Sequence, residues 1–128
     1  MKPEDLMVGD WVLIFDKTPV KVDCIGNVEV YLSEPNGQDW RVTYEHIKPI
    51  PITPEILEKN GWFYPKQSSW MKLDNPHKEL WGCTHTDGTF WLYSSGDCDK
   101  DECFAEIKYV HELQRALKVC GIDKTIVL

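Results

Sequence analysis

The chain has 128 residues, of which 42% are hydrophobic and 12% aromatic, and its formal net charge is −7. This length allows one domain with a substantial core or two very small ones, and the hydrophobic content excludes a disordered chain. Because Lys and Arg are scattered singly along an acidic chain, we do not expect direct binding to nucleic acid. No signal peptide opens the sequence and no apolar run reaches membrane-spanning length, so we expect a cytoplasmic protein without membrane association.

Short apolar or alternating runs fill the first part of the chain. The run 11–15 is too short for a helix and rich in strand formers, and residues 20–24 alternate between apolar and polar. Further strands are expected at 28–32 and 40–44, each after a turn that contains Asn and Gly. Short strands joined by tight turns predict a small, strongly bent, barrel-like subdomain over residues 1–50.

A proline-rich connector separates this region from the rest. Each proline of 49–52 fixes its own φ and keeps the preceding residue out of the helical region, so the segment is stiff and extended. Thr53 is a good N-cap for a short helix that Asn60-Gly61 ends. We therefore place a second, α+β subdomain at 51–128.

Strand patterns return after this helix. Strands are expected at the following places: 62–64, 69–73, 80–86, 89–93, 103–108 and a short last one at 125–128. Asp87-Gly88 is the strongest hairpin signal in the chain. Val110, Leu113 and Leu117 share one helical face, and Gly121 follows as the residue that can turn left-handed. The fold class is thus α+β, with an antiparallel sheet and two helices in the second subdomain.

Two resemblances follow from particular segments. The pattern Leu-x-Val-Gly-Asp-Trp-Val at 6–12 resembles the first strand of Src-homology-type barrels, which host many unrelated binding functions. The motifs Ile-x-Pro-Ile-Pro-Ile-Thr-Pro-Glu-Ile-Leu-Glu-Lys-Asn-Gly at 47–61 and Ile-Lys-Tyr-Val-His-Glu-Leu-Gln-x-x-Leu-x-x-Cys-Gly-Ile at 107–122 together resemble a group of small proteins from gut Bacteroides-type bacteria and their phages. That family has no assigned activity, so the resemblance implies a bacterial, phage or mobile-element origin and nothing about chemistry.

The five cysteines are expected to be free thiols that pack as small hydrophobic residues. An alternative is a zinc site, because two thiol or imidazole pairs can be brought together by the hairpin. Its candidate ligands are Cys83, His85, Cys98 and Cys103. Their spacing fits no common zinc module well, so we expect no metal and no cofactor.

Two further metal motifs are incomplete. The segment 111–115 falls one residue short of the zinc-protease pattern, because Arg115 stands where the second His is needed; His111 is expected near the surface of an amphipathic helix. Asp97, Asp99 and Asp101 alternate as in a calcium loop, but the glycine and the closing glutamate are missing. We expect this segment to be a solvated acidic turn.

Aromatic residues are more numerous than a core of this size requires, with six Trp, five Tyr and four Phe. Most are expected in the core, yet one exposed aromatic patch would mark a partner surface. The candidates are Trp70, Trp81 and Trp91, of which the last two flank the predicted hairpin turn.

No catalytic constellation or phosphate-binding loop is present in the sequence, so we do not expect an enzyme. The leading hypothesis is a non-catalytic binding or adaptor protein of a phage or mobile element, which uses the three Trp residues for a protein partner or for self-association. The alternatives are a small zinc protein or enzyme that uses the four candidate ligands, and an acidic phage-type inhibitor that mimics DNA.

Overall fold

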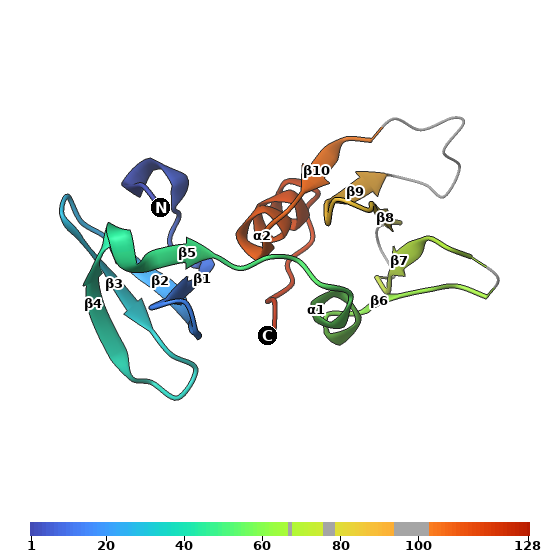
Figure 1. The fold of residues 1–128 in the computed structure, drawn as a ribbon. Coiled ribbons are helices and arrows are strands. Elements are labelled where there is room, and N and C mark those ends of the chain that lie inside the picture. Colours follow the sequence, from blue (N-terminus) through green and yellow to red (C-terminus); the bar gives the residue numbers. More distant parts are fainter. Residues whose placement is uncertain (67, 76–78, 94–102) are drawn as a thin grey trace. The chain divides into compact units, whose positions relative to one another are not determined.

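A computed structural model describes residues 1–66, 68–75, 79–93 and 103–128 (Figure 1). The chain forms two compact units. The first comprises residues 1–50 with 109–111, and the second comprises 51–108 with 112–128. Within the described ranges the structure contains two five-stranded antiparallel sheets and two α-helices, which confirms the α+β class.

The first unit is built on one antiparallel sheet. Its strands are β1 (Trp11–Ile14), β2 (Thr18–Ile25), β3 (Glu29–Ser33), β4 (Asp39–Thr43) and β5 (Ile47–Pro49), in the order β4-β3-β2-β1-β5. Short 3-10 helices at Pro3–Asp5 and Tyr44–His46 precede β1 and β5. The chain thus pairs sequential strands and then returns β5 to the free side of β1.

One face of this sheet forms an aliphatic core. The fully buried members of its cluster are Leu6, Val12, Ile14, Val20, Val22, Val30, Leu32, Val42 and Ile47. The alternation that predicted these strands therefore places the branched side chains inward, as burial of one sheet face requires.

Two expectations for this region need correction. No closed barrel is found, because β4 and β5 remain the two edges of the sheet. The strand β5 also begins at Ile47 and ends at Pro49, the first residue of the predicted connector. It pairs with β1. Proline is compatible with that place because β5 is an edge strand, where one backbone donor is not needed by the sheet.

The second unit contains the other sheet and both α-helices. Its elements are α1 (Pro54–Lys59), β6 (Trp62–Phe63), β7 (Met71–Leu73), β8 (Trp81–Thr84), β9 (Phe90–Tyr93), β10 (Ala105–Ile107) and α2 (Val110–Val119), whose first two residues group with the first unit. The strand order is β10-β9-β8-β7-β6, and α1 lies against β6 (Figure 1). No helix among the described residues is long and apolar enough to cross a membrane.

The predicted caps and turns of this unit are confirmed. Thr53 accepts a hydrogen bond from the backbone N–H of Ile56 at 3.2 Å, as an N-cap does. Gly121 has a positive φ of 76° after α2, and the N–H of Ile122 donates to the carbonyl of Leu117 at 2.9 Å. Gly88, with φ 88°, turns the chain between β8 and β9.

Aromatic packing shapes the buried face of this sheet. Trp62 and Phe90 meet edge to face with their ring centroids 5.1 Å apart. The Phe90 ring also lies directly over Gly82, where an added Cβ would fall 1.9 Å from Cζ of that ring. Gly82 is therefore required by the close approach of the ring and not by the backbone conformation.

The expected strand at 125–128 is absent. Among the described strands none includes residues 125–128, and the side chain of Asn60, which is 2% exposed, bonds Val127 of this segment. Asn60 Nδ2 donates to the carbonyl of Val127 at 2.7 Å, and its Oδ1 accepts from the N–H of Val127 at 2.7 Å. One amide side chain thus replaces a neighbouring strand, a contact that sequence periodicity does not reveal.

Candidate functional site: an aromatic sheet face

The strand register of the second sheet separates its residues into two faces. The inward face is buried and carries Trp62, Met71, Leu73, Gly82, Phe90, Leu92 and Ile107. On the opposite face, directly paired residues form one row across four strands, in the order Phe63, Lys72, Trp81 and Tyr93. A second row on that face joins Cys83, Trp91 and Glu106. Aromatic residues therefore line both faces of this sheet.

Ring contacts extend the two rows. Trp70 packs on Tyr93 with centroids 4.8 Å apart, and His85 stacks on Trp91 at 4.2 Å with an interplanar angle of 29°. Trp70 and His85 fall two residues from Lys72 and Cys83, so alternation places them on the same face. We call this surface the aromatic face, and its members are Phe63, Trp70, Lys72, Trp81, Cys83, His85, Trp91, Tyr93 and Glu106.

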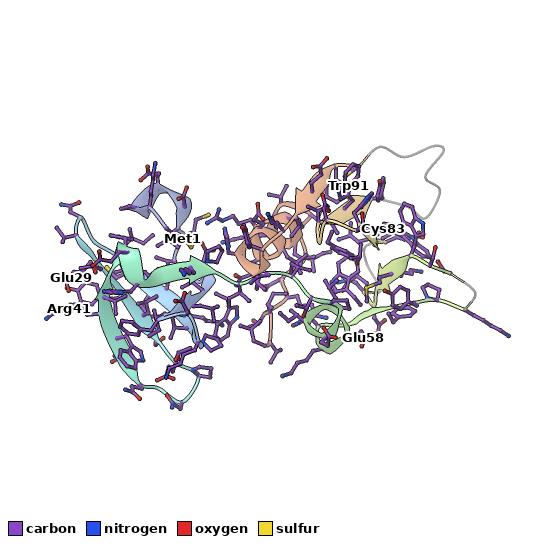
Figure 2. All side chains as sticks on the ribbon, viewed as in Figure 1. Met1, Glu29, Arg41, Glu58, Cys83 and Trp91 are labelled. Atoms are coloured by element: carbon purple, nitrogen blue, oxygen red, sulfur yellow. The ribbon has the colours of Figure 1, made fainter. Side chains whose placement is uncertain are left out.

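The structure thus brings all three predicted partner-binding residues to one face. Trp81 and Trp91 are diagonal neighbours, because Trp81 pairs with Tyr93 and Trp91 with Cys83. Figure 2 shows Trp91 and Cys83 on the adjacent strands β9 and β8. The Trp side chains are half-buried, whereas Phe63 at the end of the long row is 44% exposed.

Polar neighbours hold two of the indole rings. Trp81 Nε1 donates to a carboxylate oxygen of Glu79 at 2.8 Å, and Trp91 Nε1 donates to Oγ1 of Thr89 at 3.0 Å. The Thr89 hydroxyl in turn donates to Asp87 at 2.6 Å. Hydrogen bonds from the Thr89 hydroxyl and backbone N–H lower the pKa of the Asp87 carboxyl, so it carries a negative charge at neutral pH.

A cation already lies on this surface. Lys72 Nζ sits 5.5 Å from the centroid of the Trp81 ring, within the range of a cation–π interaction. Sequence reasoning missed Lys72 and Phe63 as members of the site. Alternation along 70–72 places Lys72 on the same face as Trp70. The pairing of Phe63 with Lys72 then places Phe63 on that face.

The zinc alternative gains no geometric support. Cys83 and His85 do share a face, but Cys98 lies outside the described residues, and Cys103 Sγ donates to the carbonyl of Ala105 at 3.2 Å. Among the residues that the structure describes, no three His, Cys, Asp or Glu side chains are grouped to hold a metal ion. The zinc site stays a prediction, and native mass spectrometry of protein purified without chelators tests it.

Three other expectations from the sequence concern the cysteines, His111 and the acidic segment. The four described cysteines are free thiols, as expected; Cys24 is exposed, so its expected packing as a buried residue is wrong, whereas Cys83, Cys103 and Cys120 are half-buried. His111 is 6% exposed and stacks on Tyr109, so its expected place near the surface is also wrong. The acidic segment with Asp97, Asp99 and Asp101 lies outside the described residues.

Two aromatic side chains of the first unit are exposed, Tyr31 on β3 and Phe15 after β1, and Phe15 belongs to a group of rings. The Phe15 ring contacts Trp40 at 6.0 Å and His46 at 5.0 Å between centroids. Phe15 has φ 52° and the next residue, Asp16, has φ 64°, a left-handed turn conformation that is rare for a bulky side chain. The three rings come from the turn after β1, from β4 and from the 3-10 helix Tyr44–His46.

Comparison with known proteins does not supply a family: no family model, no curated protein and no solved structure matches this chain.

Proposed function

We propose that this chain is a non-catalytic binding protein whose aromatic face docks a protein partner. The observation that carries the proposal is the continuous row of Phe63, Lys72, Trp81 and Tyr93 across four strands of a sheet whose other face already forms the core. Trp and Tyr are the residues most enriched at the energetic centres of protein interfaces. A broad aromatic layer on the outer side of a sheet is thus suited to a partner.

A purely structural role for these rings is the competing explanation, because directly opposed aromatic pairs stabilise a sheet. The sheet of the first unit argues against this structural role as a sufficient explanation of the aromatic face. That sheet has the same number of strands, and its buried cluster is aliphatic, with Trp40 and Tyr44 packed against it. On its outer side, Arg41 pairs with Glu29 at 3.4 Å and Ser33 bonds Asp23 at 3.1 Å. The same outer side also carries Trp11, paired with Lys21, and Tyr31, paired with Arg41, so a five-stranded sheet of this protein folds without aromatic residues paired with one another on its outer face.

The finer assignments rest on the sequence resemblances. We propose an adaptor role in a bacterial phage or mobile element from the motifs at 47–61 and 107–122. We also propose kinship of the first sheet with Src-homology-type barrels. The order β4-β3-β2-β1-β5, with a 3-10 helix before β5, supports that kinship.

The test compares three purified proteins: the natural chain, the double variant Trp81→Ala/Trp91→Ala and the control Tyr31→Ala. Tyr31 is a suitable control because it is 44% exposed on β3, in the other unit. Proteins captured from a bacterial lysate are identified, purified and re-bound by calorimetry. Losing two such anchors should weaken a true partner by about thirtyfold or more, and the control should bind unchanged.

Two results would overturn the proposal. One is a re-bound partner whose affinity is unchanged by the double variant although that variant remains folded. The other is equal loss of affinity in the Tyr31 control, which would place the partner surface elsewhere. Sedimentation of each protein alone separates a foreign partner from self-association, since a dimer that depends on Trp81 and Trp91 would make a second copy the partner.

A further inference from the structure

The chain contains two Asn-Gly steps, and the structure places them in opposite surroundings. Asn36-Gly37 lies in the turn between β3 and β4, and both of its residues are exposed (Figure 1). Asn60-Gly61 follows α1, and Asn60 is only 2% exposed. The same chemistry is open to both steps, so their surroundings decide which of them reacts.

An asparagine that precedes a glycine loses ammonia in water without an enzyme. The backbone nitrogen of the glycine attacks the side-chain carboxamide carbon, and a five-membered succinimide ring forms. The bond from this carbon to the amide nitrogen breaks, and the nitrogen takes up the proton lost by the glycine N–H and leaves as ammonia. Water then opens the ring at either carbonyl, which gives aspartate or isoaspartate without any oxidant or reductant. Glycine favours the attack because it has no side chain to hinder the approach.

The turn holds the Asn36 side chain beside the peptide that must attack it. The N–H of Gln38 donates to Oδ1 of Asn36 at 2.9 Å, which bends the side chain back along its own backbone as in an Asx turn. This bond draws electrons from the carboxamide carbon and stabilises the negative charge that develops on Oδ1 during the attack. The attacking N–H of Gly37 donates to the carbonyl of Glu34 at 2.9 Å, so one exposed turn bond must open first.

Space and solvent are both available at this turn. Gly37 has a φ of 92°, and a Cβ added there would meet nothing within 4 Å beyond its chain neighbours. Among the residues that the structure describes, no acceptor is found for Nδ2 of Asn36. Ammonia therefore leaves directly into water, and water reaches the ring that remains.

The surroundings of Asn60 oppose the same reaction. Its Nδ2, the nitrogen that would leave, donates to the carbonyls of Ile56 and Val127, both at 2.7 Å. Its Oδ1 accepts from the N–H of Val127 at 2.7 Å, so three hydrogen bonds fix the carboxamide. Burial also keeps away the water that must open the ring. More hydrogen bonds must break at Asn60 than at Asn36, and each raises the barrier.

We propose that Asn36 is a site of self-modification, at which the chain converts its own side-chain amide to aspartate and isoaspartate while Asn60 stays intact. Either product adds one negative charge to a chain whose net charge is already −7. In isoaspartate the main chain runs through Cγ, so the turn gains one backbone carbon and the acceptor used by Gln38 becomes part of the main chain. The modification is independent of the aromatic face, which belongs to the other unit.

The experiment incubates the full chain in neutral buffer and follows both Asn-Gly steps by mass spectrometry of proteolytic peptides. The peptide that contains Asn36 should gain the mass of an Asn-to-Asp conversion and separate into two products. Conversion at Asn60 should be at least about tenfold slower. Raising the pH should speed the reaction at Asn36, since the attacking nitrogen must lose its proton. In denaturant the two steps should convert at nearly equal rates, because only the fold distinguishes them.

The matched variant is Asn36→Gln, which keeps the carboxamide but would need a less favourable six-membered ring. It should lose the rapid conversion at position 36, and a two-dimensional spectrum that is unchanged outside the turn shows that it is folded. Equal rates at Asn36 and Asn60 in the folded chain overturn the proposal. It also fails if Asn36 stays intact in the folded chain while the denatured chain converts there, or if the Gln variant loses ammonia as fast as the natural chain.

Discussion

The two sheets of this protein share strand number and antiparallel pairing, but they differ in what their outer faces carry. The first presents charged and polar pairs such as Arg41 with Glu29. The second presents Trp81 against Tyr93 and Trp91 against Cys83. Because the first sheet is complete with an aliphatic cluster and an outer face on which Trp11 and Tyr31 pair with cations, folding of a five-stranded sheet does not require aromatic residues that pair with one another outside. The difference therefore points to recognition at the second sheet.

The strongest test of this comparison removes core volume from both sheets. Leu32→Ala on β3 and Leu92→Ala on β9 each delete a fully buried side chain. Each should lower the free energy of unfolding by about 3 kcal/mol, since both lose transfer energy and leave a cavity. Urea unfolding followed by circular dichroism measures the loss. A cost below about 1 kcal/mol at either site would show that the face regarded as its core is not well packed.

A smaller loss of stability is expected at Gly82, where the Phe90 ring lies over the glycine. In Gly82→Ala the new Cβ would lie 1.9 Å from Cζ of Phe90, so the ring must move. We expect a destabilisation of about 2 kcal/mol, typical of overpacking. Thermal unfolding measures it, and Gly82→Ala/Phe90→Leu should recover part of the loss because the smaller side chain makes room. Full stability of the single variant would contradict this placement of the ring.

The next largest effect on stability is expected where Asn60 holds the C-terminal segment. Asn60→Ala removes the buried amide that pairs with Val127 and takes away the partner of two part-buried backbone groups, the N–H and the carbonyl of Val127. The cost should be about 1–2 kcal/mol. Hydrogen exchange at the amide of Val127 is the more specific measurement, since this N–H should lose protection while the amides of β3 in the first unit keep theirs. Unchanged exchange would show that the segment is held by its apolar side chains instead.

The smallest effect on stability is predicted for substitutions on the outer faces of the two sheets. Trp91→Leu in the second sheet and Tyr31→Leu in the first should each change the free energy of unfolding by less than about 1 kcal/mol, because cross-strand pairs contribute no more. Chemical denaturation of the two variants side by side tests this. A loss above about 2 kcal/mol for Trp91 alone would mean that the aromatic face stabilises its sheet, and it would weaken the argument for recognition.

Much of the local structure was accessible from the sequence. The helical spacing of Val110, Leu113 and Leu117, the N-cap Thr53 and the turn residue Gly88 all depend on interactions within a few residues. Strand alternation at 20–24 likewise places Val20 and Val22 in the core, although Cys24 in the same pattern is exposed. The selection of Trp70, Trp81 and Trp91 as one surface needed only this alternation and the hairpin between β8 and β9.

What the sequence by itself determined is therefore the α+β class, most of the elements and the surplus of aromatic side chains. Only the tertiary structure decided that the first sheet stays open, that Asn60 replaces a strand at the C-terminal segment, and that Phe63 and Lys72 join the Trp row. The physical reason is the distance along the chain over which each kind of interaction acts. Periodicity and capping act between neighbours in the chain, whereas register across strands and hydrogen bonds between residues as distant as Asn60 and Val127 exist only once the chain has folded.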